Sequence, residues 1–173
     1  MHDSGKKKKK QTIPWVMLPK LSFSFQYLPD KCLDDKIKSK YFTNKIDAKE
    51  KPQFFARIFS ILKVYSGFTL KELENQGICY VLKEKKHEKI LGRLAEILSS
   101  LGYKDEWINK NFHAYLVYKF KLVSSNIRMF GYYSLGIVYV LLFDPNHLIE
   151  PDDKFGVPGN LVCTWCIKSC DKK

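Results

Sequence analysis

The chain has 173 residues, 45% of them hydrophobic, and a formal net charge of +12 at neutral pH. This length favours one domain with a substantial core, and no apolar run approaches the roughly 20 residues of a membrane-spanning helix, so an integral membrane protein is excluded. The excess of lysine and arginine favours a polyanionic partner such as nucleic acid, although a basic protein from a lysine-rich genome has the same composition.

The N-terminal residues and the cysteines indicate where the protein resides. Residues 1–18 are predicted to form a basic, disordered arm, because the like charges of Lys6–Lys10 repel one another. Two prolines interrupt the apolar residues that follow this block, so we expect no signal peptide. The five cysteines are an odd number, which favours reduced thiols over a disulfide framework. We therefore expect a cytoplasmic protein without a membrane partner.

The first part of the chain predicts one strand followed by helices. Residues 21–28 alternate apolar and polar side chains, so they predict a strand, and its pairing partners must come from later in the sequence. Residues 31–51 are highly charged and predict a long loop or a marginal helix. A helical apolar period runs over residues 52–67, and a capping box at residues 69–72 begins a second, short helix. A third helix is predicted over residues 87–101.

The later part of the chain predicts a three-stranded antiparallel meander between Tyr115 and His147. Apolar residues alternate with Lys119 and Lys121 in the first strand, and the three-residue breaks between strands have a length typical of hairpin turns. The last strand is apolar throughout, as expected of a central strand covered on both faces. Pro145 ends it because proline cannot donate to the strand ladder.

Together these elements predict an α+β fold. We expect an antiparallel sheet of about four strands, formed by the first strand and the meander, with the helices packed on one face. A single domain covers residues 19–151, and residues 152–173 form a flexible, cysteine-containing tail. Cys163, Cys166 and Cys170 supply too few ligands for an ordinary structural zinc site, so we assign no cofactor and leave open whether these thiols bind a metal.

The order of strand, helices and three antiparallel strands in a small basic chain resembles the RelE/ParE superfamily of ribosome-dependent and related toxins. The resemblance covers residues 21–147 and implies a RelE-like fold, RNA or the ribosome as partner, and messenger-RNA cleavage. It also implies an acidic antitoxin partner, as in toxin–antitoxin pairs of mobile elements. The segment RMFGYY to DPNH also resembles an uncharacterised bacterial family that ends R-x-x-G-[FY] to D-P-x-H.

The toxin resemblance implies cations around the scissile phosphate and a group that transfers a proton. Lys119, Lys121 and Arg128 would project from adjacent strands, so we take them as candidate catalytic and nucleic-acid-binding residues. The planar guanidinium of Arg128 can hold two phosphate oxygens at once. The candidates for proton transfer are Tyr132 or Tyr133, and His147.

Structural alternatives and other function classes remain open. Arg128 is equally typical of a solubilising strand edge, and Asp144–His147 is also a good turn, in which the Asp144 carboxylate bonds to its own backbone. A helix-turn-helix DNA-binding protein would use residues 69–76 as its recognition helix, but the two glutamates there suit a phosphate-lined groove poorly. A non-enzymatic interaction protein of a phage or plasmid defence module is a third class, so the sequence does not decide whether the protein is an enzyme.

Overall fold

The computed structural model describes residues 19–38, 40–122, 127–150 and 159–162. The arm predicted over residues 1–18 and the three C-terminal cysteines lie outside the described residues. The elements in chain order are β1 (Ser22–Ser24), β2 (Asp34–Ile37), β3 (Lys40–Thr43), β4 (Ile46–Asp47), α1 (Lys51–Tyr65), α2 (Leu70–Asn75), β5 (Cys79–Val81), α3 (Glu84–Ser100), α4 (Asp105–Ala114), β6 (Leu116–Leu122), β7 (Ile127–Ser134), β8 (Ile137–Asp144) and β9 (Leu161–Val162).

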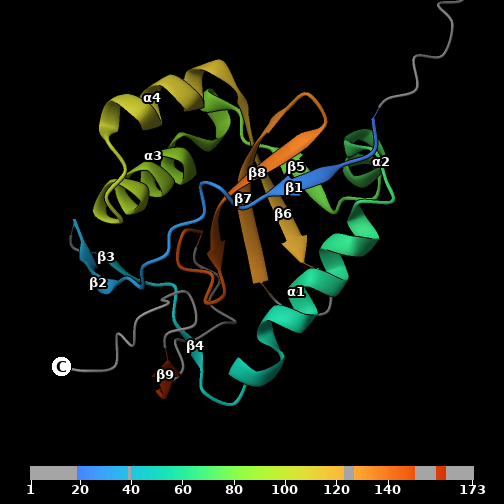
Figure 1. The fold of residues 1–173 in the computed structure, drawn as a ribbon. Helices are drawn as coiled ribbons and strands as arrows, with labels where there is room; N and C mark the ends of the chain where they lie inside the picture. The colour runs from blue at the N-terminus through green and yellow to red at the C-terminus, as the bar shows by residue number, and fades with distance from the viewer. Residues whose placement is uncertain (1–18, 39, 123–126, 151–158, 163–173) are drawn as a thin grey trace, which may run out of the picture.

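Five of the described strands form one mixed sheet, in the order β1-β8-β7-β6-β5 (Figure 1). Strands β6, β7 and β8 form the predicted antiparallel meander, and β1 joins it by the predicted long-range pairing. Two details of the prediction were wrong. The sheet has five strands instead of about four, because residues 79–81, which the sequence left open as a brief strand or a linker, form β5 and pair antiparallel with β6, and β1 runs parallel to β8. A two-residue side-chain period reveals a strand but not its direction.

Helices cover both faces of this sheet, whereas the sequence predicted one covered face. Helices α1 and α2 pack on the face that includes Tyr118 and Phe120, and α3 and α4 pack on the face that includes Val117 and Phe130. Figure 1 shows the two helix pairs on opposite sides of the strands. The second covered face explains why β8 is apolar along its whole length.

The charged segment over residues 31–51 forms the β2–β3 hairpin and β4, not the predicted loop or marginal helix. Phe42 of β3 is fully buried in the core beneath α3. Arg93 of α3 holds the hairpin end by donating hydrogen bonds to the carbonyls of Ile37 (2.9 Å) and Lys40 (2.8 Å). The hairpin therefore depends on tertiary contacts, which its polar sequence does not reveal.

Two further elements were absent from the prediction. Helix α4 packs against α3 through buried Ile108, and β9 pairs antiparallel with β4 inside the segment predicted as a flexible tail. The Ala48 amide extends that pairing by donating to the Asn160 carbonyl at 2.9 Å. None of the described helices has the length and apolar character needed to cross a bilayer.

Candidate nucleic-acid interface

The three predicted phosphate ligands lie on one face of the sheet, on strands β6 and β7. Lys121 is directly opposite Arg128, and Lys119 lies two residues from Lys121 on the same strand. Because side chains two residues apart in a strand share a face, the register brings the three cations together. This is the face covered by α3 and α4, and the cations lie toward the end of it that the loop after β8 covers.

Glu150, in that loop, engages two of the three cations. Its carboxylate forms an ion pair with Lys119 and lies 3.6 Å from Nη1 of Arg128, and its backbone carbonyl accepts a hydrogen bond from the same guanidinium. The side chains of Lys119 and Arg128 are only 6% and 14% exposed, so they are not the solvent-facing groups that the sequence predicted. Lys121 is exposed. In this conformation Glu150 holds the position at which a phosphate would meet Lys119 and Arg128.

Tyr132 does not lie beside Arg128. It is four residues from Arg128 along β7, which corresponds to about 13 Å at roughly 3.3 Å per residue. Its ring is stacked between those of Tyr115 and Tyr139, with centroid separations of 4.9 and 4.8 Å. Burial, reinforced by the neighbouring Tyr27, raises the pKa of Tyr132 well above its usual value. The structure therefore separates this candidate for proton transfer from Arg128, whereas Lys119 lies diagonally opposite Tyr132 on the neighbouring strand.

The turn after β8 is fixed by Asp144. Its two carboxylate oxygens accept the backbone N–H groups of Leu148 at 2.9 Å and Ile149 at 3.0 Å, so the structural alternative for this carboxylate is confirmed. Burial raises the pKa of Asp144, and these two hydrogen bonds oppose the shift. His147 is buried in the same turn, with a left-handed φ of 57°. A proton-transfer role for His147 stays a prediction.

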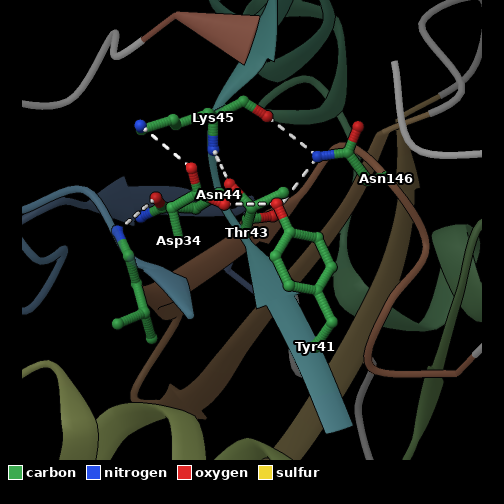
Figure 2. Close-up of polar contacts among 7 residues, drawn as sticks. Asp34, Tyr41, Thr43, Asn44, Lys45 and Asn146 are labelled. Atoms are coloured by element: carbon green, nitrogen blue, oxygen red, sulfur yellow. Dashed lines mark hydrogen bonds and ion pairs between the residues drawn. The ribbon is translucent and has the colours of Figure 1, made fainter. Parts of the chain in front are cut away.

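Asn146 ties this turn to the segment that joins β3 and β4. Its side-chain amide donates to the carbonyl of Lys45 at 2.8 Å and to that of Thr43 at 3.3 Å, as Figure 2 shows. The Lys45 ammonium in turn lies 3.0 Å from the Asp34 carboxylate. The sequence indicated a turn residue at Asn146, but its partners lie more than a hundred residues earlier, so no local signal could reveal this contact.

A second group of cations, which the sequence analysis did not single out, lines a cleft of about 620 Å³ along β5. Beside Cys79, Tyr80 and Val81 of β5, its lining consists of Lys71, Glu74, Asn75, Lys83, Lys86 and His87. Lys71 comes from α2, and the other two lysines come from the beginning of α3. Three cations therefore face one carboxylate, and Glu74 lies 3.5 Å from Lys71.

The edge position of β5 adds hydrogen-bonding groups to this cleft. Alternate residues of β5 bond to β6, so the N–H and C=O groups of Cys79 and Val81 point away from the sheet. The backbone N–H of Lys83 donates to Nδ1 of His87 at 3.0 Å, at the residue where α3 is kinked. A neutral His87 ring with Nδ1 as acceptor carries its proton on Nε2, which makes that atom a donor.

Tyr80 lies between the cleft and the sheet cations. It is directly opposite Lys119 in the β5–β6 register, and the Lys119 ammonium lies 4.8 Å from the centroid of the Tyr80 ring. The His87 ring approaches the same tyrosine, with centroids 5.7 Å apart. Ammonium groups, an imidazole and aromatic rings in one place suit an oxyanion or a nucleotide chain.

The cysteines and acidic groups offer no metal centre within the described part of the chain. Among those residues, no group of three or more His, Cys, Asp or Glu side chains is arranged to hold a metal ion. Cys79 is a free thiol, and burial raises its pKa to about 12, so it is unreactive at neutral pH. Cys32 is disulfide-bonded, which differs from the reduced thiols predicted.

Fold and site define an α+β protein with a mixed five-stranded sheet between two helix pairs and a basic cleft at one sheet edge. The chain belongs to the family described as Uncharacterised protein UU032, whose family model matches residues 26–171. No curated protein and no solved structure matches the chain. The family description assigns no activity, and the RelE/ParE resemblance stays a prediction, so function must be argued from the geometry.

Proposed function

We propose that this protein binds RNA through the basic cleft along β5. The observation that supports the proposal is the gathering of Lys71, Lys83 and Lys86 around one cleft that contains a single glutamate. The net charge of +12 supports it further, because lysine and arginine side chains that neutralise phosphates release the condensed counterions of the polyanion into solution. Lys119 and Arg128, by contrast, are engaged by Glu150.

The lining of the cleft favours a single strand over a duplex. A basic groove beside aromatic rings is typical of sites that track a single-stranded backbone, and Tyr80 and His87 supply such rings here. The helix-turn-helix alternative finds little support, because its third helix, α3, follows β5 and packs on the opposite face of the sheet from α1 and the recognition helix α2. We propose RNA and not DNA as the ligand because of the RelE resemblance.

RNA cleavage is not part of the proposal. A RelE-like mechanism with Arg128 and Tyr132 requires both groups at one phosphate, and their places along β7 are about 13 Å apart. The ribosome-dependent endoribonuclease, its acidic antitoxin and the defence-module alternative therefore stay predictions.

The test compares two triple variants of the full chain. One replaces the cleft lysines Lys71, Lys83 and Lys86 by glutamine, and the control replaces Lys49, Lys51 and Lys110, which are exposed elsewhere. Binding to a fluorescein-labelled single-stranded RNA is measured by fluorescence anisotropy over a range of salt concentrations. We expect the cleft variant to bind about tenfold or more weakly, and the slope of log K against log salt to decrease by about 2, since each lost phosphate contact removes about 0.7.

The control variant should retain most of the affinity and slope. Equal losses in the two triple variants would mean that affinity follows net charge and not the cleft, and would overturn the proposal. The same assay with duplex DNA tests the choice of ligand. We expect weaker binding to the duplex, whereas a sequence-dependent preference for duplex DNA would favour the helix-turn-helix class.

A further inference from the structure

We propose that Lys119 and Arg128 form a binding site for a phosphate group, which the Glu150 side chain closes in this structure. The site lies on the α3/α4 face of the sheet and adjoins the β5 cleft through Tyr80, but it includes none of the cleft lysines, so it does not depend on RNA binding by the cleft. Its ligand class is a phosphate, either free in solution or part of a nucleic-acid backbone.

The two cations are held in place by the sheet. They lie on neighbouring strands, and the Lys119 ammonium rests 4.8 Å above the ring centroid of Tyr80. With side-chain exposures of 6% and 14%, both cations have lost most of their hydration. A cation removed from water requires an anion close to it, so this position demands a negatively charged oxygen.

Two carboxylates supply such oxygens: Glu150 pairs with Lys119 and Arg128, and the fully buried Asp144 lies directly opposite Arg128. Of the two carboxylates, only that of Glu150 is exposed. Its side chain is 40% exposed, while the residue before it, Ile149, is buried and bonded through its N–H to Asp144. The Glu150 carbonyl is also fixed by Arg128. Rotation of the Glu150 side chain alone therefore moves the carboxylate away, with the loop backbone in place.

The donors that this rotation exposes match a phosphate better than a carboxylate. The Lys119 ammonium offers up to three N–H groups, and the Arg128 guanidinium, whose Nη1 also donates to the Glu150 carbonyl, adds those of its N–H groups that are not engaged elsewhere. A phosphate presents more acceptor oxygens and, as a monoester or free ion, more charge than Glu150. The carboxylate still competes strongly, because its attachment to the chain gives it a high effective concentration. Wild-type protein is therefore expected to bind phosphate weakly.

The test removes the charge of Glu150 while keeping its shape. Inorganic phosphate is titrated into the full chain by isothermal calorimetry at constant ionic strength, with the wild type, Glu150→Gln, and the double variant Lys119→Met/Glu150→Gln. We expect Glu150→Gln to bind phosphate about tenfold or more tightly than the wild type, since the competing carboxylate is gone. The double variant should lose this gain, because methionine fills the space of Lys119 without its charge.

Two controls keep the outcome decisive. Glu106→Gln removes an exposed carboxylate on α4 and should leave phosphate binding at the wild-type level. Glu150→Asp keeps the negative charge but shortens the side chain by one methylene, so its carboxylate lies farther from Lys119. This variant replaces Glu150→Gln in the test if circular dichroism shows that Glu150→Gln does not fold. It should bind phosphate more tightly than the wild type. Equal phosphate affinities in wild type and Glu150 variants, or a gain that survives Lys119→Met, would overturn the proposal.

A second titration identifies the source of the phosphate. A short RNA without terminal phosphates offers only backbone phosphates. If Glu150→Gln strengthens binding of this RNA and Lys119→Met cancels the effect, the site takes nucleic-acid phosphates. If only inorganic phosphate gains, the site takes small phosphate compounds. Failure of the wild type to bind RNA would overturn the cleft proposal and leave the phosphate result unaffected.

Discussion

At the scale of single residues, contacts in the structure explain three positions of the segment from Arg128 to His147. Arg128 holds Glu150, and Asp144 accepts the two N–H groups that shape the turn after β8. Gly131 lies at a bulge between β7 and β8, where the backbone of β8 approaches closely. A Cβ at that position would lie 2.7 Å from the Tyr139 carbonyl oxygen. Gly131 is therefore required for lack of space and not for an unusual φ.

Gly131→Ala should accordingly destabilise the protein by about 1–3 kcal/mol, because the added methyl group forces two central strands apart. Urea unfolding monitored by circular dichroism measures this change in the free energy of unfolding. Gly92→Ala is the matched control, since a Cβ there meets nothing within 4 Å in the middle of α3. It should be neutral or stabilise by about 0.5–1 kcal/mol. Similar effects of the two substitutions would refute the steric explanation.

At the scale of elements, the sequence correctly predicted those features that depend on interactions between residues close together in the chain. The capping box is formed, with the Thr69 side chain accepting the Glu72 N–H and the Glu72 side chain accepting the Thr69 N–H. The apolar periods of α1 and α3 and the hairpin turn at Leu135 also follow from neighbouring residues. The β2–β3 hairpin could not be predicted in this way, because Asp34–Ile37 contains a single buried residue.

The β2–β3 hairpin should therefore fail locally when its tertiary anchor is removed. Arg93→Lys retains the charge but loses the planar fork that reaches two carbonyls, so we expect a loss of about 1.5–3 kcal/mol. Hydrogen exchange should show faster exchange of the hairpin amides and little change in β7. Lys38→Gln tests the same hairpin at an exposed ion pair with Glu96, where the expected effect is within about 1 kcal/mol. An unchanged hairpin in Arg93→Lys would show that other contacts hold it.

At the scale of the whole molecule, the candidate site was predictable only in part. The two-residue period correctly placed Lys119, Lys121 and Arg128 on one face. Their closure by Glu150 depends on a loop that folds back over the sheet, which the strand pattern cannot reveal. The basic cleft was missed although its lysines lie on or beside the consecutive elements α2, β5 and α3, because only the folded arrangement of these elements shows that the side chains line one cleft. The distance between Arg128 and Tyr132, however, follows directly from their spacing along one strand.

The sheet has a helix pair on each face, so it divides the interior into two cores that share the same strands. Leu62 of α1 and Leu98 of α3 are buried in different cores, and replacing either by alanine should destabilise the protein by about 2–5 kcal/mol. Because both cores require the sheet, each variant should still unfold in one transition. The slope of the free energy of unfolding against urea concentration should be unchanged.

In the double variant the two losses should add to within about 0.5 kcal/mol, since the sheet separates the two side chains and they share no partner. Urea titration followed by tryptophan fluorescence and by circular dichroism measures both quantities on the same samples. If the two signals change at different urea concentrations in either single variant, the cores unfold independently. Such a result would contradict the claim that the sheet couples the stabilities of the two cores.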